Sequence, residues 1–386
     1  MPGAYTPLNR LADGMSTPHT KYKGDAPDLS SAMKAAVLKE FKEPVVIEDR
    51  ERPQVAADDD VVIELEATGI CRSDWHMWQG DWRWMIDDLP TDQILGHEPA
   101  GRVVETGPGV ERFSEGDQVA VPFNIADGSC PMCYSDQSHL CENRVTPGFS
   151  PELPGAFAEE MRVPHADENL ALLPEGASPE GMAGLGCRFM TAYHGIVHRI
   201  DADVGESIAV HGCGGVGLSA VHIADAMGLD VVAVDINEEP LERARSLGAD
   251  ATVNAGEAED VPGEVHDITD GGADYSVDAL GIAETCTNSV LSLDVGGTHI
   301  QIGLTGEDEE GVVPVPVDLI TGQELEFVGS KGMQPTRYDE LVRMVEKGRL
   351  DPTKVITETV SLDDVPGVLE SMTGFDHTGV SVVTDY

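Results

Sequence analysis

The most regular pattern of apolar and polar positions in this chain is a strand, a turn, a helix and a second strand. Residues 207–211 are short, apolar and β-branched, which predicts a buried parallel strand. Apolar positions then recur at near-helical spacing over residues 218–227, and Gly228 follows as a helix stop. A second apolar strand over residues 231–234 leads directly into Asp235. The pattern predicts a βαβ unit with an acid at the end of its second strand.

The turn of this unit is Gly-Cys-Gly-Gly-Val-Gly. Its first glycine allows a tight turn, the second lets the backbone approach a pyrophosphate, and the last lets the helix pack close to the strand. The helix N-terminus favours the anion, and an acid 23 residues past the first glycine suits the adenine ribose hydroxyls. A glycine turn alone also occurs without a ligand, but its coincidence with strand, helix and acid favours a dinucleotide site. The residues assigned to that site are Gly212, Gly214, Gly215, Val216, Gly217 and Asp235.

The patterns elsewhere divide the chain into an extension and two domains. Strands alternate with helices over residues 188–329, which predicts a doubly wound parallel sheet of the Rossmann type. Residues 32–187 contain short β-type runs separated by Gly and Pro turns, which predicts an irregular, mainly β domain. We expect residues 330–386 to return to that domain. Residues 1–31 are polar and rich in Pro, Gly and Thr, so we expect an extension without a core of its own. The fold class is therefore α/β.

Charge adds information on partners and surroundings. The chain has 386 residues, 41% of them hydrophobic, and a formal net charge of −46, spread over its whole length. It lacks the clustered cations of a nucleic-acid or anionic-membrane binder, and its hydrophobic content is that of a globular protein. An acid-coated surface suits very high salt, which predicts a cytoplasmic protein of a salt-accumulating halophile; an ordinary acidic mesophilic enzyme is the alternative. The first thirty residues lack the apolar stretch of a signal peptide, and we expect no transmembrane span.

Three separate segments carry candidate metal ligands. Cys71 lies in Gly-Ile-Cys-Arg-Ser-Asp-Trp-His, His97 in Gly-His-Glu-Pro-Ala-Gly, and Cys187 in Gly-Cys-Arg-Phe-Met-Thr. Two thiols and an imidazole suit Zn²⁺, and three protein ligands leave a fourth position open, as at catalytic zinc. Seen singly, each cysteine would more often be a small buried hydrophobe and the histidine a satisfied core residue. In a long cytosolic chain, cysteines indicate metal or catalytic use more than disulfides.

From Met33 to the C-terminus, these motifs and their order resemble the zinc-dependent medium-chain alcohol dehydrogenases, here of a halophilic type. The resemblance implies a GroES-like catalytic domain beside an NAD-binding Rossmann domain. It also implies zinc-dependent, reversible oxidation of a small-molecule alcohol to an aldehyde or ketone by hydride transfer to NAD. Cys71, His97 and Cys187 match the catalytic zinc ligands, and Asp74 matches the acid that orients the ligand histidine.

The resemblance extends to four further residues. Glu98 matches a glutamate that can approach the metal during ligand exchange, and Thr191 matches a contact to the nicotinamide. Ser73 matches the hydroxyl donor to the alcohol, and His76 matches the outer end of the proton relay. The family forms dimers and tetramers, so the resemblance implies a homo-oligomer, with a tetramer preferred over a dimer.

A second cysteine cluster, Cys130, Cys133 and Cys141, matches a structural zinc lobe in which the family pattern has a fourth cysteine. That position is Asp127 here. Because a carboxylate can ligate zinc at about 2.0–2.2 Å, a Cys₃Asp site is expected. The alternative is a lobe that has lost its metal and is held by packing and hydrogen bonds.

All four tryptophans, Trp75, Trp78, Trp82 and Trp84, fall within ten residues beside the first metal segment. Together with Met85 they are candidates for the wall of an apolar alcohol pocket, with Trp78 the preferred one. A local lid or a subunit contact is the alternative.

Two other functions remain open. A polyol or sugar dehydrogenase of the same superfamily is the first, although those enzymes often carry a glutamate where Cys187 stands. A non-catalytic nucleotide-binding or sensor protein is the second, although it would be expected to lose zinc ligands or relay residues. The residues after Asp235 are Ile, Asn, Glu and Glu, without a cation for a 2′-phosphate, which predicts NAD over NADP.

Overall fold

The computed structural model describes residues 32–84, 89–174, 176–374 and 379–386. The expected N-terminal extension, residues 1–31, lies outside the described residues. So do Met85 and the side chain of Trp84, two of the candidates for the pocket wall.

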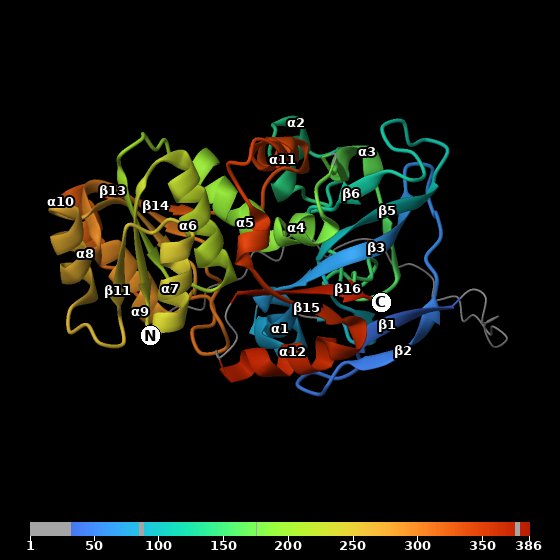
Figure 1. Cartoon of the computed structure of the whole chain (residues 1–386), viewed down its shortest axis with the longest axis horizontal. Coiled ribbons are helices and arrows are strands. Elements are labelled where there is room, and N and C mark those ends of the chain that lie inside the picture. The colour runs from blue at the N-terminus through green and yellow to red at the C-terminus, as the bar shows by residue number, and fades with distance from the viewer. Residues whose placement is uncertain (1–31, 85–88, 175, 375–378) are drawn as a thin grey trace.

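One sheet has six strands, all parallel, in the order β11-β10-β9-β12-β13-β14. The chain runs outward from β9 and then returns to its other side with β12, so the strand order reverses beside β9. In open α/β sheets, ligands bind outside the carboxyl ends of the strands at such a reversal. This sheet and its helices fill the left side of Figure 1. Its elements are β9 (Ser207–His211), α6 (Gly215–Met227), β10 (Asp230–Asp235), α7 (Glu238–Ser246), β11 (Ala251–Asn254), α8 (Val261–Thr269), β12 (Ala273–Asp278), α9 (Ala283–Leu291), β13 (Leu293–Gln301), α10 (Val317–Gln323) and β14 (Glu326–Gly329).

The strand–turn–helix–strand prediction is confirmed, with one shift of boundary. Helix α6 begins at Gly215, three residues before the predicted apolar stretch, because Gly214 is its N-cap and the glycines form its first turn.

A second sheet has seven strands and is mostly antiparallel. Its path is β15-β16-β3-β5-β6-β8, and β7 pairs with β3. The last strand, β16, pairs with β3, so the C-terminal segment returns to the sheet that β3 helps to form. The strands are β3 (Val61–Ile70), β5 (Glu98–Thr106), β6 (Gln118–Ala120), β7 (Glu160–Val163), β8 (Ala171–Leu172), β15 (Ile356–Ser361) and β16 (Val380–Asp385). A three-stranded sheet of β2 (Val46–Glu51), β1 (Ala32–Leu38) and β4 (Gln93–Ile94) lies beside it.

A continuous core joins the two large sheets through helix α5 (Cys187–Tyr193). One buried cluster contains Ala67 of β3, Phe189 of α5 and Ile208 of β9. Figure 1 shows α5 between the two halves of the molecule. After α5 the chain makes one turn of π-helix, η4 (His194–His198). The remaining helices that bear on the site are α1 (Arg72–Gln79), η2 (Asp81–Trp84), α2 (Pro131–Tyr134), η3 (Ser138–Leu140), α3 (Ala166–Asn169), α4 (Pro179–Gly184), α11 (Tyr338–Glu346) and α12 (Val365–Ser371).

Within the described part of the chain, no helix has both the length and the apolar character needed to cross a membrane.

Candidate functional site

The fold brings the three predicted metal segments together. Strands β3 and β5 pair with Gly69 opposite Glu98, which sets Cys71, just past β3, beside His97, just before β5. Cys187 joins them as the first residue of α5. The ligand atoms of Cys71, His97, Glu98 and Cys187 all lie within 4.8 Å of one another.

Asp74 fixes the orientation of the histidine in this cluster. Its Oδ1 lies 2.8 Å from His97 Nδ1 and accepts from the Gly96 amide at 3.2 Å, while its Oδ2 accepts from the Cys71 amide at 2.9 Å. With Nδ1 engaged by a carboxylate, Nε2 is the His97 nitrogen left to bind a metal ion. That Nε2 is buried and has no hydrogen-bond partner. A buried ring nitrogen without a partner, beside two thiols, fits a metal ion.

The two thiols of this cluster shift each other's pKa in opposite directions. The hydrogen bond from the Cys187 thiol holds the pKa of Cys71 well below its usual value, and the same contact with Cys71 raises the pKa of Cys187. A thiolate is the form that binds metal, so one of the two sulfurs is already prepared as a ligand.

Glu98 forms a buried ion pair with Arg188, a residue to which the sequence analysis gave no role. Arg188 Nη2 contacts Glu98 Oε2, the Arg188 amide donates to Oε1 at 3.1 Å, and Nη1 donates to the Ile70 carbonyl at 2.8 Å. Burial raises the pKa of Glu98 to about 7, against the opposing charge of Arg188. The available signal was that an arginine directly following a buried ligand cysteine needs a carboxylate partner.

Ser73 and His76 both lie on α1, three residues apart. His76 Nδ1 lies 2.7 Å from Asp81 Oδ2, and its ring stacks on Trp82 with centroids 5.2 Å apart. Asp81 is only 9% exposed and was also missed from the sequence. Within the described residues, no hydrogen bond joins the Ser73 and His76 side chains directly.

Trp78 and Trp82, two of the candidates for the pocket wall, both pack in one buried cluster. Trp78 lies on the same buried face of α1 as Met77, packs in the core and donates its Nε1–H to the Glu43 carbonyl at 2.5 Å. Trp82 instead lies near the site: its ring centroid is 6.0 Å from that of Phe149, which is 4.8 Å from that of His97. The rings that contact His97 are therefore Phe149 and Phe123, whose centroid lies 5.9 Å from that of His97, and Trp82 packs on Phe149.

The glycine turn has the geometry that its sequence predicts. Gly212 has φ +90°, and a Cβ on Gly217 would lie 1.7 Å from the Gly212 carbonyl oxygen, so helix and strand pack too closely for a side chain. A Cβ on Gly214 would meet nothing within 4 Å, so this glycine faces open space. Asp235 Oδ2 accepts from the Cys213 amide at 2.8 Å and its Oδ1 from the Asn237 amide at 3.0 Å. These bonds hold the carboxylate beside the turn.

Thr191 connects α5 to the loop after β14. Its hydroxyl donates to the Cys187 carbonyl at 2.6 Å and accepts from the Gly332 amide at 3.0 Å. The Ser330 hydroxyl donates to the Thr191 carbonyl at 2.9 Å. Thr191 thus lies between the metal cluster and the carboxyl-end side of the parallel sheet.

The second cysteine cluster also assembles as predicted. The ligand atoms of Asp127, Cys130, Cys133 and Cys141 lie within 4.8 Å of one another. Asp127 Oδ1 is 3.3 Å from Cys141 Sγ and 3.9 Å from Cys133 Sγ, and all seven cysteines are free. The Glu142 amide lowers the pKa of Cys130 to about 7, whereas burial raises the pKa of Cys141 to about 12. Three sulfurs and one carboxylate are a donor set that fits zinc.

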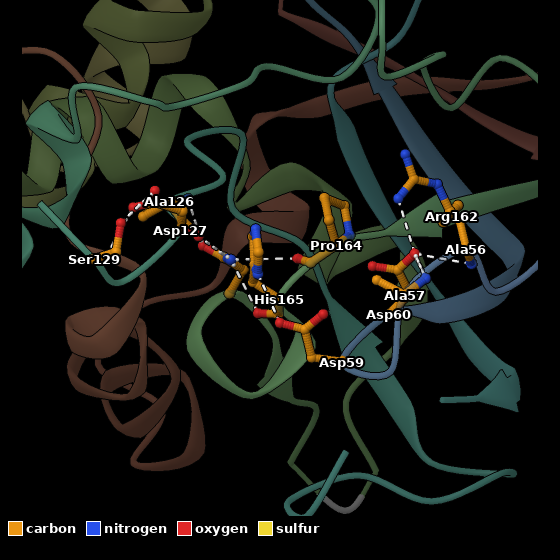
Figure 2. Close-up of polar contacts among 11 residues, drawn as sticks. Ala56, Ala57, Asp59, Asp60, Ala126, Asp127, Ser129, Arg162, Pro164 and His165 are labelled. Carbon is orange, nitrogen blue, oxygen red and sulfur yellow. Dashed lines mark hydrogen bonds and ion pairs between the residues drawn. The ribbon is translucent and has the colours of Figure 1, made fainter. Parts of the chain in front are cut away.

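Local hydrogen bonds aim Asp127 into this cluster. Its carboxylate accepts from the Ser129 amide at 2.9 Å, from the Ser129 hydroxyl at 2.6 Å and from Asn143 Nδ2 at 2.7 Å. The Ser129 bonds hold the pKa of Asp127 well below its usual value. The preceding residue, Ala126, is fixed by two 2.8 Å bonds to the buried Asn169 side chain, which also contacts the His165 carbonyl (Figure 2).

Comparison with known proteins gives consistent matches over most of the chain. Residues 57–175 match the alcohol dehydrogenase GroES-like domain, and residues 215–347 match the zinc-binding dehydrogenase family. An alcohol dehydrogenase of Geobacillus stearothermophilus is 34% identical over 88% of this chain and 95% of its own length. An NAD-dependent alcohol dehydrogenase of Sulfurisphaera tokodaii is 33% identical over 91% of this chain and 99% of its own. The solved structure of the alcohol dehydrogenase TADH from Thermus sp. ATN1 superposes with a TM-score of 0.84 at 30% identity, covering 92% of this chain and all of that one.

Proposed function

Because this chain belongs to the zinc-binding alcohol dehydrogenase family, we propose that it catalyses the reversible oxidation of an alcohol to an aldehyde or ketone, with zinc and NAD as cofactors. The observation that carries this proposal is the donor set of buried Cys71 and His97 and half-buried Cys187, whose ligand atoms converge. The glycine turn at the start of α6 supplies the matching dinucleotide site.

Cys71, His97 Nε2 and Cys187 would hold the zinc ion and leave its fourth position to substrate. Zinc supplies Lewis-acid chemistry and NAD is the electron acceptor. Asp74 keeps His97 in the tautomer that a metal requires. Glu98, held by Arg188, is the carboxylate that lies next to the three ligands.

Proton transfer falls to Ser73 and His76. Ser73 lies on the first turn of α1, two residues after Cys71, where its hydroxyl can accept a hydrogen bond from the alcohol or donate one to it. His76 engages Asp81 through Nδ1, so its Nε2 is the atom that takes up the proton. No described hydrogen bond joins the two side chains, so Ser73 and His76 would act at opposite ends of the proton path, with Ser73 nearer the metal cluster.

NAD would lie on the turn formed by Gly212, Gly214, Gly215, Val216 and Gly217, with Thr191 at the nicotinamide end and Asp235 at the adenine ribose. The carboxylate of Asp235 accepts hydrogen bonds from a ribose diol and repels a 2′-phosphate. The nearest cations, Arg243 and Arg245, are already paired with Glu239 at 3.7 Å and Glu238 at 2.7 Å. We therefore expect a higher kcat/KM with NAD⁺ than with NADP⁺, and Asp235→Ser should narrow the gap. A native preference for NADP⁺ would contradict this assignment.

The test of the function is an alcohol panel assayed with NAD⁺ and NADP⁺ in molar KCl, together with the zinc content of the purified protein. Simple alcohols should be oxidised in a zinc-dependent reaction. Turnover of sorbitol or sugars in preference to simple alcohols would favour a polyol dehydrogenase, for which the aromatic rings of Trp82 and Phe149 offer few hydrogen bonds. A protein that binds nucleotide but turns over none of these substrates would be the non-catalytic alternative.

Asp127, Cys130, Cys133 and Cys141 are proposed to hold a second, structural zinc ion. The supporting observation is that Asp127 points its carboxylate at two sulfurs through bonds from Ser129 and Asn143. We assign residues 32–187 and 330–386 to the catalytic domain, residues 188–329 to the NAD domain and residues 1–31 to an extension.

The setting is proposed to be the cytoplasm of a halophile. Dilution from about 1 M to 0.1 M salt lengthens the Debye length from about 3 Å to about 10 Å. Because the chain carries a net charge of −46, the repulsion between its surface charges then grows. The melting temperature should therefore be lower in 0.1 M KCl than in 3 M KCl, and an unchanged value would contradict the proposal.

We also propose a homo-oligomer. Edge strand β14 leaves Phe327 44% exposed, and Val295 of the neighbouring β13 is 71% exposed. A tetramer is preferred over a dimer on resemblance alone, and light scattering in molar KCl would decide between them.

A further inference from the structure

The buried pair Glu98–Arg188 lies where three glycines from different elements leave room for it. A Cβ on Gly69, in β3, would lie 2.5 Å from Glu98 Oε2 and 2.8 Å from Arg188 Nη2. A Cβ on Gly186 would lie 2.6 Å from Glu98 Cβ, and one on Gly215 would lie 2.6 Å from Arg188 Cδ. Such distances are far inside van der Waals contact. The ion pair therefore occupies space that side chains would fill at the end of β3, the start of α5 and the first turn of α6.

This pair spans the space between the metal cluster and the nucleotide turn. At one end, the Glu98 carboxylate lies within 4.8 Å of the other ligand atoms of the cluster. At the other end, the Arg188 methylenes lie against Gly215 in the first turn of α6. Arg188 is 4% exposed, and its Nε is buried without a hydrogen-bond partner, 3.5 Å from where a Gly215 Cβ would sit.

The position of Arg188 also matters electrostatically. A buried guanidinium next to a helix N-terminus adds to the positive potential there, and this potential favours the phosphates of a dinucleotide. The same charge neutralises Glu98, whose carboxylate is otherwise costly to bury. The Arg188 guanidinium therefore attracts both an anion at the glycine turn and the Glu98 carboxylate.

We propose that Arg188 is a positioning residue that couples the metal cluster to the nucleotide turn. This proposal rests on the function proposed above. Movement of the turn on nucleotide binding displaces the Arg188 side chain by direct contact, and Arg188 in turn shifts the Glu98 carboxylate beside the metal. Because coupling between two sites is reciprocal, occupancy of the metal cluster must alter nucleotide affinity by the same factor.

The experiment measures the dissociation constant of NADH by fluorescence titration on zinc-loaded and zinc-free full-length protein. In the native protein the two constants should differ by about fivefold or more, in the usual range for coupled sites. In Arg188→Met the ratio should fall towards one, and in Arg188→Lys, which keeps a cation but loses the planar fork, it should be intermediate. A native ratio of one, or an unchanged ratio in Arg188→Met, would overturn the proposal. Absence of NADH binding to the native protein would instead overturn the proposed function, and the coupling with it.

A second arm tests the contact between Arg188 and the turn. Gly215→Ala should weaken NADH binding, and the loss should be several-fold smaller in the Arg188→Ala background, where the methyl group has room. Gly214→Ala is the matched control, because its Cβ would meet nothing within 4 Å and its effect should be equal in both backgrounds. Equal losses for Gly215→Ala in both backgrounds would show that Arg188 does not transmit the position of the turn. This arm stands even if Arg188→Met fails to fold, because Gly215→Ala should also change the zinc-dependent ratio of the native protein.

Discussion

The two metal clusters of this chain are built on different principles. In the cluster of Cys71, His97 and Cys187, the first two residues are buried and Cys187 is half-buried, and its members come from three segments that meet only through the pairing of β3 with β5 and the start of α5. The lobe cluster lies within residues 127–141, and its carboxylate is oriented by hydrogen bonds from near neighbours. The first geometry depends on distant segments that meet in the fold, whereas the second is set mostly within one segment, with Asn169 holding Ala126 from outside it.

The surroundings of the two clusters differ in the same way. Around the first cluster, Asp74, Glu98 and Arg188 are all buried. Asp74 accepts from the Cys71 amide and pairs with His97, and Glu98 accepts from the Arg188 amide. In the lobe, Asp127 and Asn143 are partly or fully open to solvent. A pre-organised, water-excluding site suits chemistry, because electrostatic interactions are stronger there. An accessible site at a local loop suits a structural ion.

Removing a ligand from the first cluster should have the largest effect. Cys71→Ala, His97→Ala or Cys187→Ala should lower kcat/KM by at least about a thousandfold, because a Lewis acid contributes several kcal/mol to such a reaction. NADH binding should survive, which separates loss of chemistry from loss of the fold. Cys286→Ala is the matched control, since Cys286 is buried but belongs to neither cluster of the described residues. Near-native turnover in any ligand variant would remove that residue from the set.

Removing a ligand from the lobe cluster should lower the stability of the protein more than its activity. Asp127→Ala should reduce the zinc content from two ions per chain to one and keep part of the activity. The free energy of unfolding should fall by about 2 kcal/mol or more, because a bound ligand stabilises the native state by mass action. Glu142→Ala, an exposed residue of the same segment, should retain both ions. One zinc ion per chain in native protein with a full active site would contradict the Cys₃Asp assignment.

Periodicity and spacing were sufficient to predict the parallel sheet and the glycine turn, because these depend on short stretches of sequence, whereas the two ligand sets were assigned from the resemblance of their motifs to a known family. The partners of the site residues could not be predicted in that way. Arg188 follows Cys187 directly, yet its carboxylate partner lies 90 positions earlier and meets it only in the folded chain. His76 reaches Asp81 because Gly80 turns the backbone through φ +71° after α1.

The tryptophans show the same limit. Clustering of tryptophans shows that large apolar surfaces are near the metal loop, but the direction of each ring depends on the fold. Trp78 lies on α1 and donates its Nε1–H to the Glu43 carbonyl, whereas Trp82 lies past the turn at Gly80 and stacks on His76. These partners could not be read from the spacing of the tryptophans.

Substituting the residues that hold the ligands in place should have smaller effects than substituting the ligands themselves. Asp74→Asn should weaken zinc binding at the first cluster by about 10–100-fold, since it removes the charged partner of a ligand histidine. Asn143→Ala, which removes one of the bonds to Asp127, should weaken zinc binding in the lobe by less, because Ser129 still holds the carboxylate. Chelator competition on the two variants measures both constants. Equal zinc retention by Asp74→Asn and the native protein would show that burial alone fixes His97.

The smallest effect concerns the face on which the lobe packs. His194, in the π-helical turn, has its ring centroid 4.7 Å from that of His139 in the lobe, and its Nδ1 lies 3.1 Å from His198 Nδ1. Burial lowers the pKa of His194 to about 3, with further lowering by His139, His198, Arg199 and Arg337.

Since the ordinary pKa of histidine is about 6.5, the unfolded chain binds a proton at this position between about pH 6.5 and pH 3 and the native chain does not. The stability supplied by neutral His194 is therefore present above pH 6.5 and is lost as pH falls below it. Between pH 7 and pH 5 the loss should be about 1–2 kcal/mol. His194→Gln should remove that part of the acid sensitivity, which denaturant unfolding at the two pH values in the same salt would measure. Above pH 7.5 the native and variant stabilities should change in parallel, and an equal loss in both between pH 7 and pH 5 would show that protonation of His194 does not weaken the lobe contact.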